Sequence, residues 1–259
     1  MNWRLRRQLF VLALLAAAGL IVAALIIVPK VTKPGTCFDG KQNGTEEGAD
    51  CGGSCAIQCT NLQTPPTIVW ARSVPVTTTL YTAVASVTNQ NRTSALYKAT
   101  YEFRLYDEAN KFIVKREGSI TLPPNRETTI VEPIIDIGTR PPKYTVFAWT
   151  TPLVWYRVDP RAIDVDLVPL DIVLTNEGVE PKLTANIKNT SLYDLPRTDV
   201  IALLYDKDNT LVGASKTYLE NIASNETEPV FFTWPHAFPA PVAFTIVRPL
   251  IDIFSVPLI

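Results

Sequence analysis

Residues 101–114 read YEFRLYDEANKFIV, and residues 200–212 read VIALLYDKDNTLV. In the first stretch, apolar residues alternate with charged residues and lead into a polar, turn-forming segment; the second stretch has a similar polar segment at 206–209. Alternation with a period of two is typical of a strand with one buried face, and a short polar segment between two apolar runs predicts a hairpin. The two stretches therefore predict the same β-hairpin twice.

The similarity between the two halves of the chain continues at a spacing near 100 residues. The matching segments are Val87-Thr-Asn89 with Ile187-Lys-Asn189, Leu105 with Leu204, Val114 with Val212, and Asn125 with Asn225. A repeat of about 100 residues made of short strands has the size of an immunoglobulin-like sandwich. We expect an all-β fold with two tandem immunoglobulin-like β-sandwiches, at residues 67–157 and 161–259. They are expected to fold separately, in series, with a junction near Asp159-Pro160-Arg161.

Composition argues against several classes of protein. The chain of 259 residues has 24 basic and 25 acidic residues and no basic tract, which argues against a nucleic-acid partner. It contains no nucleophile elbow, zinc-protease or phosphate-loop motif. The single histidine, His236, has no serine, cysteine or acid at a recognisable motif spacing. We therefore expect a protein that is not an enzyme. We expect no cofactor, with Ca²⁺ as the one candidate.

The N-terminal region predicts a membrane anchor. Residues 9–28 read LFVLALLAAAGLIVAALIIV, and a helix of this length rises about 30 Å, the thickness of a bilayer core. Arginines 4, 6 and 7 precede the run and lysines 30 and 33 follow it, so the positive-inside rule places residues 1–8 in the cytoplasm and 29–259 outside. The expected location is the cell membrane, with a single pass. A signal peptide cleaved within residues 16–24 is the alternative.

All the cysteines lie shortly after this apolar run, at Cys37, Cys51, Cys55 and Cys59. Their spacing lacks the paired C-x2-C elements of structural zinc sites, and no histidine lies nearby. Outside the cytoplasm, two disulfides are the expected state of four such cysteines. Residues 29–66 are thus predicted to be a disulfide-rich stalk, with the pairing left open.

Oxygen-bearing side chains recur between the glycines of this stalk, at Asp39, Asn43, Glu46 and Asp50. Such a loop could gather these oxygens around Ca²⁺, which takes six to eight oxygen ligands. The alternative is that these residues are turn formers on a solvated loop. The segment resembles the C-x-D-G-x-x-N-G-x-E-x-x-x-D-C-G-G-x-C elements of many extracellular and bacterial envelope proteins, a resemblance that implies a surface setting.

Residues Phe103, Leu105, Tyr106 and Asp107 match the F-x-L-Y-D signature, and the chain resembles the FxLYD domain, an immunoglobulin-like module of bacterial envelope proteins. The second half keeps Leu204, Tyr205 and Asp206 but has Ala202 in place of the phenylalanine. The resemblance implies an extracytoplasmic β-sandwich in a single-pass membrane protein. Since the apolar positions would face the core and the aspartate would begin the turn, the motif is expected to be structural.

Residues 234–241, WPHAFPAP, form the most aromatic and proline-rich loop of the second half. Trp234, His236 and Phe238 are therefore the candidate partner surface, because aromatic residues concentrate in interface hot spots. The alternative is that the large aromatics of this loop belong to the core.

These observations favour a non-enzymatic, membrane-anchored binding, adhesion or scaffold protein outside the cytoplasm. Its expected partners are the lipid bilayer and other envelope proteins or surface polymers. The first alternative is a structural subunit of an envelope or secretion assembly. The second is a surface enzyme that uses only acids, such as a glycan hydrolase, with Asp164, Asp166 and Asp171 near the junction as candidate carboxylates.

Overall fold

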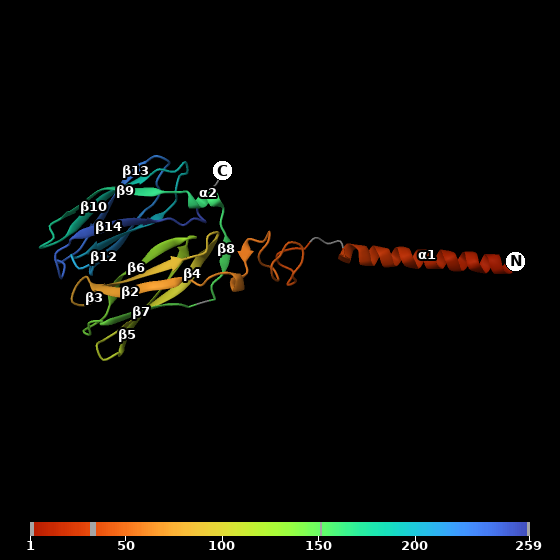
Figure 1. The fold of residues 1–259 in the computed structure, drawn as a ribbon, viewed down its shortest axis with the longest axis horizontal. Helices are drawn as coiled ribbons and strands as arrows, with labels where there is room; N and C mark the ends of the chain where they lie inside the picture. The colour runs from red at the N-terminus through yellow and green to blue at the C-terminus, as the bar shows by residue number, and fades with distance from the viewer. Residues whose placement is uncertain (1–2, 32–34, 151, 258–259) are drawn as a thin grey trace. The chain divides into compact units, whose positions relative to one another are not determined.

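The computed structural model describes residues 3–31, 35–150 and 152–257, and the chain divides into two units, residues 1–55 and 56–259 (Figure 1). The first unit contains a long helix and the first three cysteines. The second unit contains all the β-sheets. The expected all-β fold with an N-terminal apolar helix and a disulfide-rich segment is confirmed.

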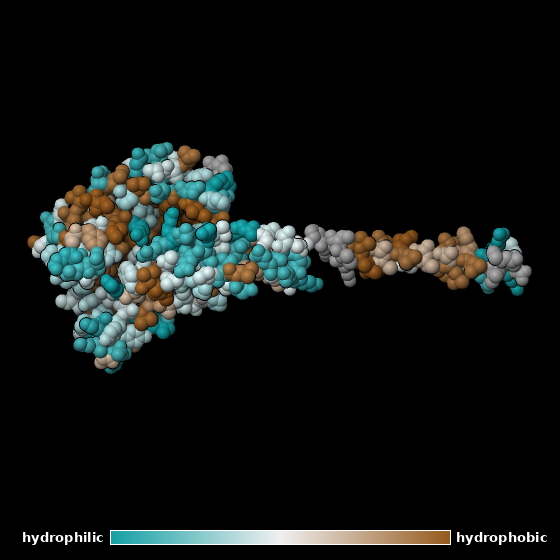
Figure 2. Space-filling view, viewed as in Figure 1, coloured by the Kyte–Doolittle hydropathy of each residue, from teal (hydrophilic) through white to brown (hydrophobic). Residues whose placement is uncertain are grey.

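Helix α1 (Trp3–Val31) contains the predicted apolar run. Within Arg6–Val28, an 18-residue window has a mean hydropathy of 3.1. Figure 2 shows hydrophobic side chains along this helix, with hydrophilic ones at its N-terminal end. A helix satisfies its own backbone hydrogen bonds, so this segment is able to cross a membrane as an anchor or to act as a signal sequence. Of the flanking cations, Lys33 lies outside the described residues.

The first sandwich consists of two antiparallel sheets. The first has the order β2-β3-β6, with β2 (Thr67–Pro75), β3 (Leu80–Asn89) and β6 (Arg126–Asp136). The second has the order β1-β8-β4-β5 with β7 also paired to β4; its strands are β1 (Ile57–Gln58), β4 (Ser94–Tyr106), β5 (Phe112–Leu122), β7 (Tyr144–Trp149) and β8 (Trp155–Arg157). A short 3-10 helix, η1 (Thr60–Leu62), lies between β1 and β2. Phe103, Leu105 and Trp155 are buried between the sheets.

The second sandwich follows a short helix α2 (Pro160–Ile163), which Asp159 caps by accepting a hydrogen bond from the Arg161 amide. One sheet has the order β13-β10-β9, with β9 (Leu167–Thr175), β10 (Lys182–Asn189) and β13 (Thr227–Thr233). The other has the order β12-β11-β14, with β11 (Thr198–Tyr205), β12 (Leu211–Leu219) and β14 (Phe244–Leu250). The pairings of β9 to β14 repeat those of β2 to β7 strand for strand.

The predicted hairpins close with the same turn. Asp107 Oδ1 accepts hydrogen bonds from the amides of Ala109 and Lys111, at 3.1 and 2.8 Å. In the second hairpin, Asp206 Oδ1 accepts from the amides of Asp208 and Thr210, at 2.9 and 2.8 Å. Each turn also contains an asparagine with positive φ, Asn110 or Asn209, a conformation that asparagine tolerates better than most residues.

The two sandwiches pack face to face, which differs from the expected arrangement of separate units in series. Sheet β2-β3-β6 of the first lies against sheet β12-β11-β14 of the second. We call their shared apolar cluster the inter-sandwich core; its buried members are Val74, Val84, Val131, Ile201, Leu203, Leu211 and Ala214. The face of β3 that carries Thr82 and Val84 is therefore buried as well as the face toward the first core: Val84 is 0% exposed and Thr82 is 1% exposed.

Candidate functional site

A cleft of about 850 Å³ opens where the inter-sandwich core ends, and we call it the inter-sandwich cleft. The first sandwich contributes residues of β4, β5 and β6, and the second contributes residues from the start of β9, from β11 and β12, and from β14 onward. Its cationic lining residues are Lys98, Arg126, Arg197, Lys216 and Arg248. Its acidic lining residues are Glu127, Asp166, Asp199 and Asp252.

The strand register of the second sandwich explains why one sheet face is apolar at one end and charged at the other. Ile246 and Ala214 lie on either side of Leu203, in the inter-sandwich core. Two residues further along, Arg248 and Lys216 lie on either side of Ile201. Because residues two apart in a strand point to the same side, this second row places two cations on the face that meets the first sandwich.

Asp199 connects the cations of this wall. Its carboxylate lies 3.8 Å from Lys216 Nζ and 4.0 Å from Arg197 Nε. The Arg197 guanidinium also lies 3.7 Å from the centre of the Tyr218 ring, a cation–π geometry. One carboxylate therefore faces two cations at the mouth of the cleft.

Two hydroxyl groups of the first sandwich form hydrogen bonds with charged residues of the cleft lining. Arg248 Nη1 donates to Thr129 Oγ1 at 3.4 Å, and the Ser86 hydroxyl donates to Glu127. Thr129 and Ser86 are both buried. Buried hydroxyls need hydrogen-bond partners. The Arg248–Thr129 contact links the facing sheets of the two sandwiches, and the Ser86–Glu127 contact lies within the first sandwich.

Tyr101 of the first sandwich lines the cleft, and its phenol belongs to a hydrogen-bonded cluster with Glu132 and Arg116. The Tyr101 hydroxyl donates to Glu132 Oε1 at 2.7 Å, and Arg116 Nε donates to Glu132 Oε2 at 3.1 Å. Burial, with a further contribution from the Glu132 charge, raises the pKa of Tyr101 well above its usual range. Both carboxylate oxygens of Glu132 are thus held by protein donors, which is the arrangement of a structural group.

Sequence reasoning missed this cluster. Glu132 pairs with Ala83, which points into the first core, so a charged residue occupies an inward position of β6. A break of this kind in an otherwise apolar alternation is the signal that would have identified it, because a buried carboxylate needs partners.

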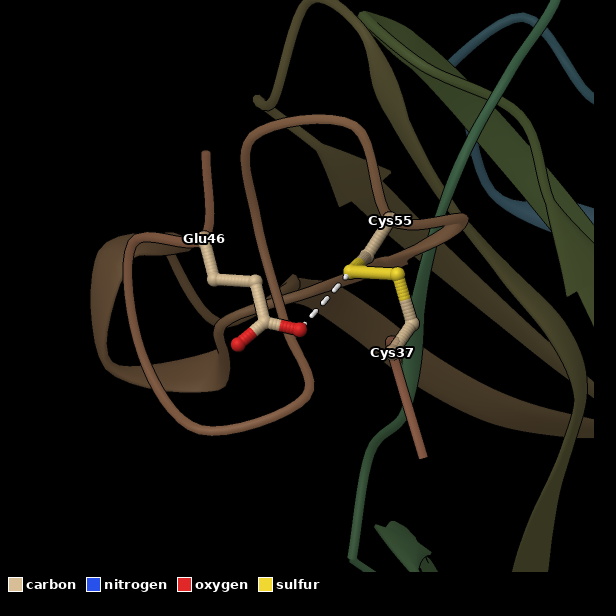
Figure 3. A group of neighbouring side chains, drawn as sticks. All are labelled: Cys37, Glu46 and Cys55. Atoms are coloured by element: carbon tan, nitrogen blue, oxygen red, sulfur yellow. Dashed lines mark hydrogen bonds between the residues drawn. A yellow bond between two sulfur atoms is a disulfide. The ribbon is translucent and has the colours of Figure 1, made fainter. Parts of the chain in front are cut away.

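The cysteine-rich segment has the predicted oxidised cysteines. Cys37 and Cys55 form a disulfide with a Cα–Cα distance of 5.7 Å, and Cys51 and Cys59 are disulfide-bonded as well. Figure 3 shows Glu46 beside the first disulfide, with Oε1 3.5 Å from Cys55 Sγ. Because disulfide sulfurs offer no thiolate, Cys37, Glu46 and Cys55 do not make a metal site of the thiolate type.

The four candidate calcium ligands form one hydrogen-bonded network. The Asp50 carboxylate accepts from the amides of Asp39 and Gly40, both at 2.8 Å. Asn43 Nδ2 donates to Asp39 Oδ2 at 2.8 Å, and the Asn43 amide donates to Glu46 Oε2 at 3.0 Å. The hydrogen bond from the Asn43 side chain is the main reason why the pKa of Asp39 is lowered. These contacts suit the turn-forming interpretation, and calcium binding stays a prediction.

The structure corrects the predicted partner surface. Trp234 is 4% exposed and belongs to the second core, where its Nε1 donates to the Ala214 carbonyl at 3.4 Å. Phe238 packs edge-on against Trp234, with ring centres 5.1 Å apart. Of the three candidate residues, only His236 is exposed. The loop was rich in aromatic residues because it covers the core, so it lacks the exposed tryptophan that the prediction needed.

The structure does not gather the three candidate carboxylates in the cleft. Asp166 lines it, and of the three acids it is the one that does so among the described residues. Asp171 Oδ2 accepts a hydrogen bond from Asn186 at 2.9 Å, and Asp164 ends helix α2. The cleft therefore does not hold two of these three acids as the carboxylate pair that a glycosidase mechanism uses.

Comparisons with known proteins leave the family open. No model of a known protein family matches the chain, and no curated protein matches it in sequence. Similar solved structures include a glycosyl hydrolase family 2 member from Bacteroides cellulosilyticus, with 10% identity over 68% of this chain and 25% of that one, at a TM-score of 0.28. PorU from Porphyromonas gingivalis has 15% identity over 74% of this chain and 19% of its own, at 0.23. Red sea bream transglutaminase has 11% identity over 73% of this chain and 31% of its own, at 0.23. The chain thus spans a third or less of these proteins, and at such scores the similarities carry no functional argument.

Proposed function

We propose that this chain is a non-enzymatic, membrane-anchored binding protein whose two immunoglobulin-like modules form one recognition site at the inter-sandwich cleft. The observation that carries the proposal is the cleft itself, which needs both modules to form its walls. Its volume of about 850 Å³ is within the range of ligand sites, roughly 300–1,000 Å³. Its lining combines charged groups with apolar side chains, as such sites commonly do.

An extracytoplasmic location is part of this proposal. The disulfides support it, because disulfides persist in oxidising compartments and are rare in the cytosol. The arginines at 4, 6 and 7 support an anchor with its N-terminus in the cytoplasm. The sandwiches would then be presented outside the cell membrane.

We also propose that the two modules arose by duplication of an FxLYD-like unit of the bacterial envelope. Phe103 and Leu105 are buried in the first core and Leu204 in the second. Asp107 and Asp206 hold equivalent turns. A motif with these contacts stabilises its hairpin, so the proposed binding activity is assigned to the cleft and not to the motif.

A structural subunit of an envelope assembly is the second candidate. It is favoured by apolar side chains on the outer face of sheet β13-β10-β9, where Val173 and Phe231 lie on either side of Thr184. Val173 is 50% exposed and Phe231 is 62% exposed. Exposed apolar side chains on a sheet face are typical of contacts with another protein.

Site-specific photo-crosslinking in the native membrane separates the two candidates. A photoreactive residue at Arg197 tests the cleft, one at Phe231 tests the outer sheet face, and one at the exposed Lys207 serves as a control. The binding proposal expects a crosslinked species from position 197 that is missing from positions 231 and 207. Crosslinks from 231 alone would favour the structural subunit, and no crosslink from 197 would overturn the proposal.

A further inference from the structure

We infer that the inter-sandwich cleft binds a polyanionic glycan, that is, a polysaccharide segment with carboxylate or sulfate groups. This inference rests on the proposed function, since it names the ligand class for the same cleft. Three properties carry it: cations of the lining without carboxylate partners, hydroxyl groups of the lining, and an aromatic cluster outside the lining, next to Lys98 and Asp252.

The first property is an excess of cationic hydrogen-bond donors. Arg126 and Arg248 have no ion pair among the described residues, and Arg248 donates a hydrogen bond to the neutral Thr129 hydroxyl. Lys98 lies 5.1 Å from the centre of the Tyr97 ring. An arginine presents several N–H donors in a planar fork that matches a carboxylate or sulfate group.

Three of the four acids of the lining are engaged within the protein, and the fourth is Asp166. Asp252 accepts from the Phe254 amide and the Ser255 hydroxyl, at 3.1 and 3.0 Å. Glu127 accepts from Ser86, and Asp199 faces two cations. An anionic ligand therefore meets Asp166, three acids whose charge is partly compensated, and two arginines that have no ion pair among the described residues.

The second property is a row of hydroxyl groups beside these cations. Ser119, Thr121 and Thr128 line the first-sandwich wall. A hydroxyl both donates and accepts hydrogen bonds, so it pairs with a sugar hydroxyl in either direction. This wall suits a ligand rich in hydroxyl groups better than an apolar peptide.

The third property is an aromatic cluster next to Lys98 and Asp252. The Tyr97 ring lies 5.0 Å from Phe254 and 6.1 Å from Tyr156, with all three rings packed edge to face. Tyr97 and Phe254 remain partly exposed. An aromatic face is electron-rich and attracts C–H groups that carry a partial positive charge, as on a sugar ring.

Binding to the full-length protein in detergent micelles tests this inference, with a labelled polygalacturonate oligosaccharide as the probe and neutral dextran of similar length as its control. The double variant Arg126→Gln with Arg248→Gln removes the two lining arginines that have no ion pair among the described residues. The matched control is Arg92→Gln, because Arg92 is an exposed arginine that does not line the cleft.

We expect polygalacturonate to bind, dextran to bind at least about tenfold more weakly, and the double variant to lose about tenfold in affinity while Arg92→Gln stays within about twofold of wild type. Binding should weaken as salt increases. Absence of polygalacturonate binding, equal binding of dextran, or an equal loss in Arg92→Gln would each overturn the inference. If the crosslink from position 197 captures a protein, the glycan inference fails while the binding proposal stands.

Discussion

Asn89 and Asn189 hold the same position in the two sandwiches, at the end of β3 and of β10, and both are fully buried. Asn89 Nδ2 donates to the carbonyls of Ser94 and Pro123, at 2.8 and 2.9 Å. Asn189 Nδ2 donates to the carbonyl of Tyr193 at 2.8 Å and to those of Ile222 and Ala223, both at 3.1 Å. In each sandwich one amide group thus ties together two loops from different parts of the chain.

Replacing Asn189 by alanine should lower the free energy of unfolding by about 3 kcal/mol or more. The reason is that the variant leaves buried carbonyls without a donor, and each costs about 1–3 kcal/mol. Urea unfolding of the full chain in detergent measures this change. The exposed Asn221, which does not have a positive φ, provides the control, because Asn221→Ala should stay within about 0.5 kcal/mol. Equal effects of the two substitutions would contradict the assigned role.

The inter-sandwich core should stabilise both sandwiches together. Ile201→Ala removes a fully buried side chain from it, and we expect a loss of about 2–5 kcal/mol in the free energy of unfolding. Val173→Ala, at a half-exposed position, should cost much less. Thermal unfolding of both variants gives the comparison. If Ile201→Ala left the unfolding of the first sandwich unchanged, the two modules would be independent after all.

Gly118 should not accept a side chain. It pairs with Tyr101, and a Cβ at this position would lie 2.5 Å from the phenol oxygen and 2.7 Å from Glu132 Oε1. Gly118→Ala should therefore destabilise the chain by about 1–3 kcal/mol, as overpacking does. Gly178 is the matched control because an added Cβ there meets nothing within 4 Å. Chemical denaturation should show Gly178→Ala to be neutral or slightly stabilising.

The buried phenol should make stability depend on alkaline pH. The pKa of Tyr101 in the folded state is raised above its ordinary value of 10.0, mainly by burial. Its contribution is therefore fully present below pH 10 and is lost as pH rises above 10, because the unfolded state then releases the proton first. Tyr101→Phe should lose less stability than wild type between about pH 9 and 12. Parallel alkaline slopes in the two unfolding curves would show that other groups cause the loss.

The proposed orientation predicts which part of the chain is accessible from outside. External protease on spheroplasts should remove residues after 29 and leave a tag at residue 1 intact. The arginines at 4, 6 and 7 are the reason for this expectation. Loss of the tag with protection of the sandwiches would mean the reverse orientation.

The local alternation of apolar and polar residues was enough to predict the strands, but not which other strands pack against each of their faces. In β3, Ala83, Ala85 and Val87 alternate with Thr82, Val84 and Ser86, a period of two that indicates one buried face, and strands of the same module cover that face. Burial of Val84 on the other face depends on a second module more than 100 residues away, and no local period reports such a contact. The cleft was missed for the same reason, since its two walls come from different modules. Trp234 was misassigned because aromatic content alone does not distinguish a core loop from a contact surface.

The contact between the modules is heterologous, since each module uses a different one of its two sheets. Such a contact does not close on itself, so it leaves β4 and its neighbours on one side and β13-β10-β9 on the other without a module against them. Val173 and Phe231 already place apolar side chains on the second of these sheets. Further duplication could therefore lengthen the array by one module at a time, and every added junction would bring a new cleft with it.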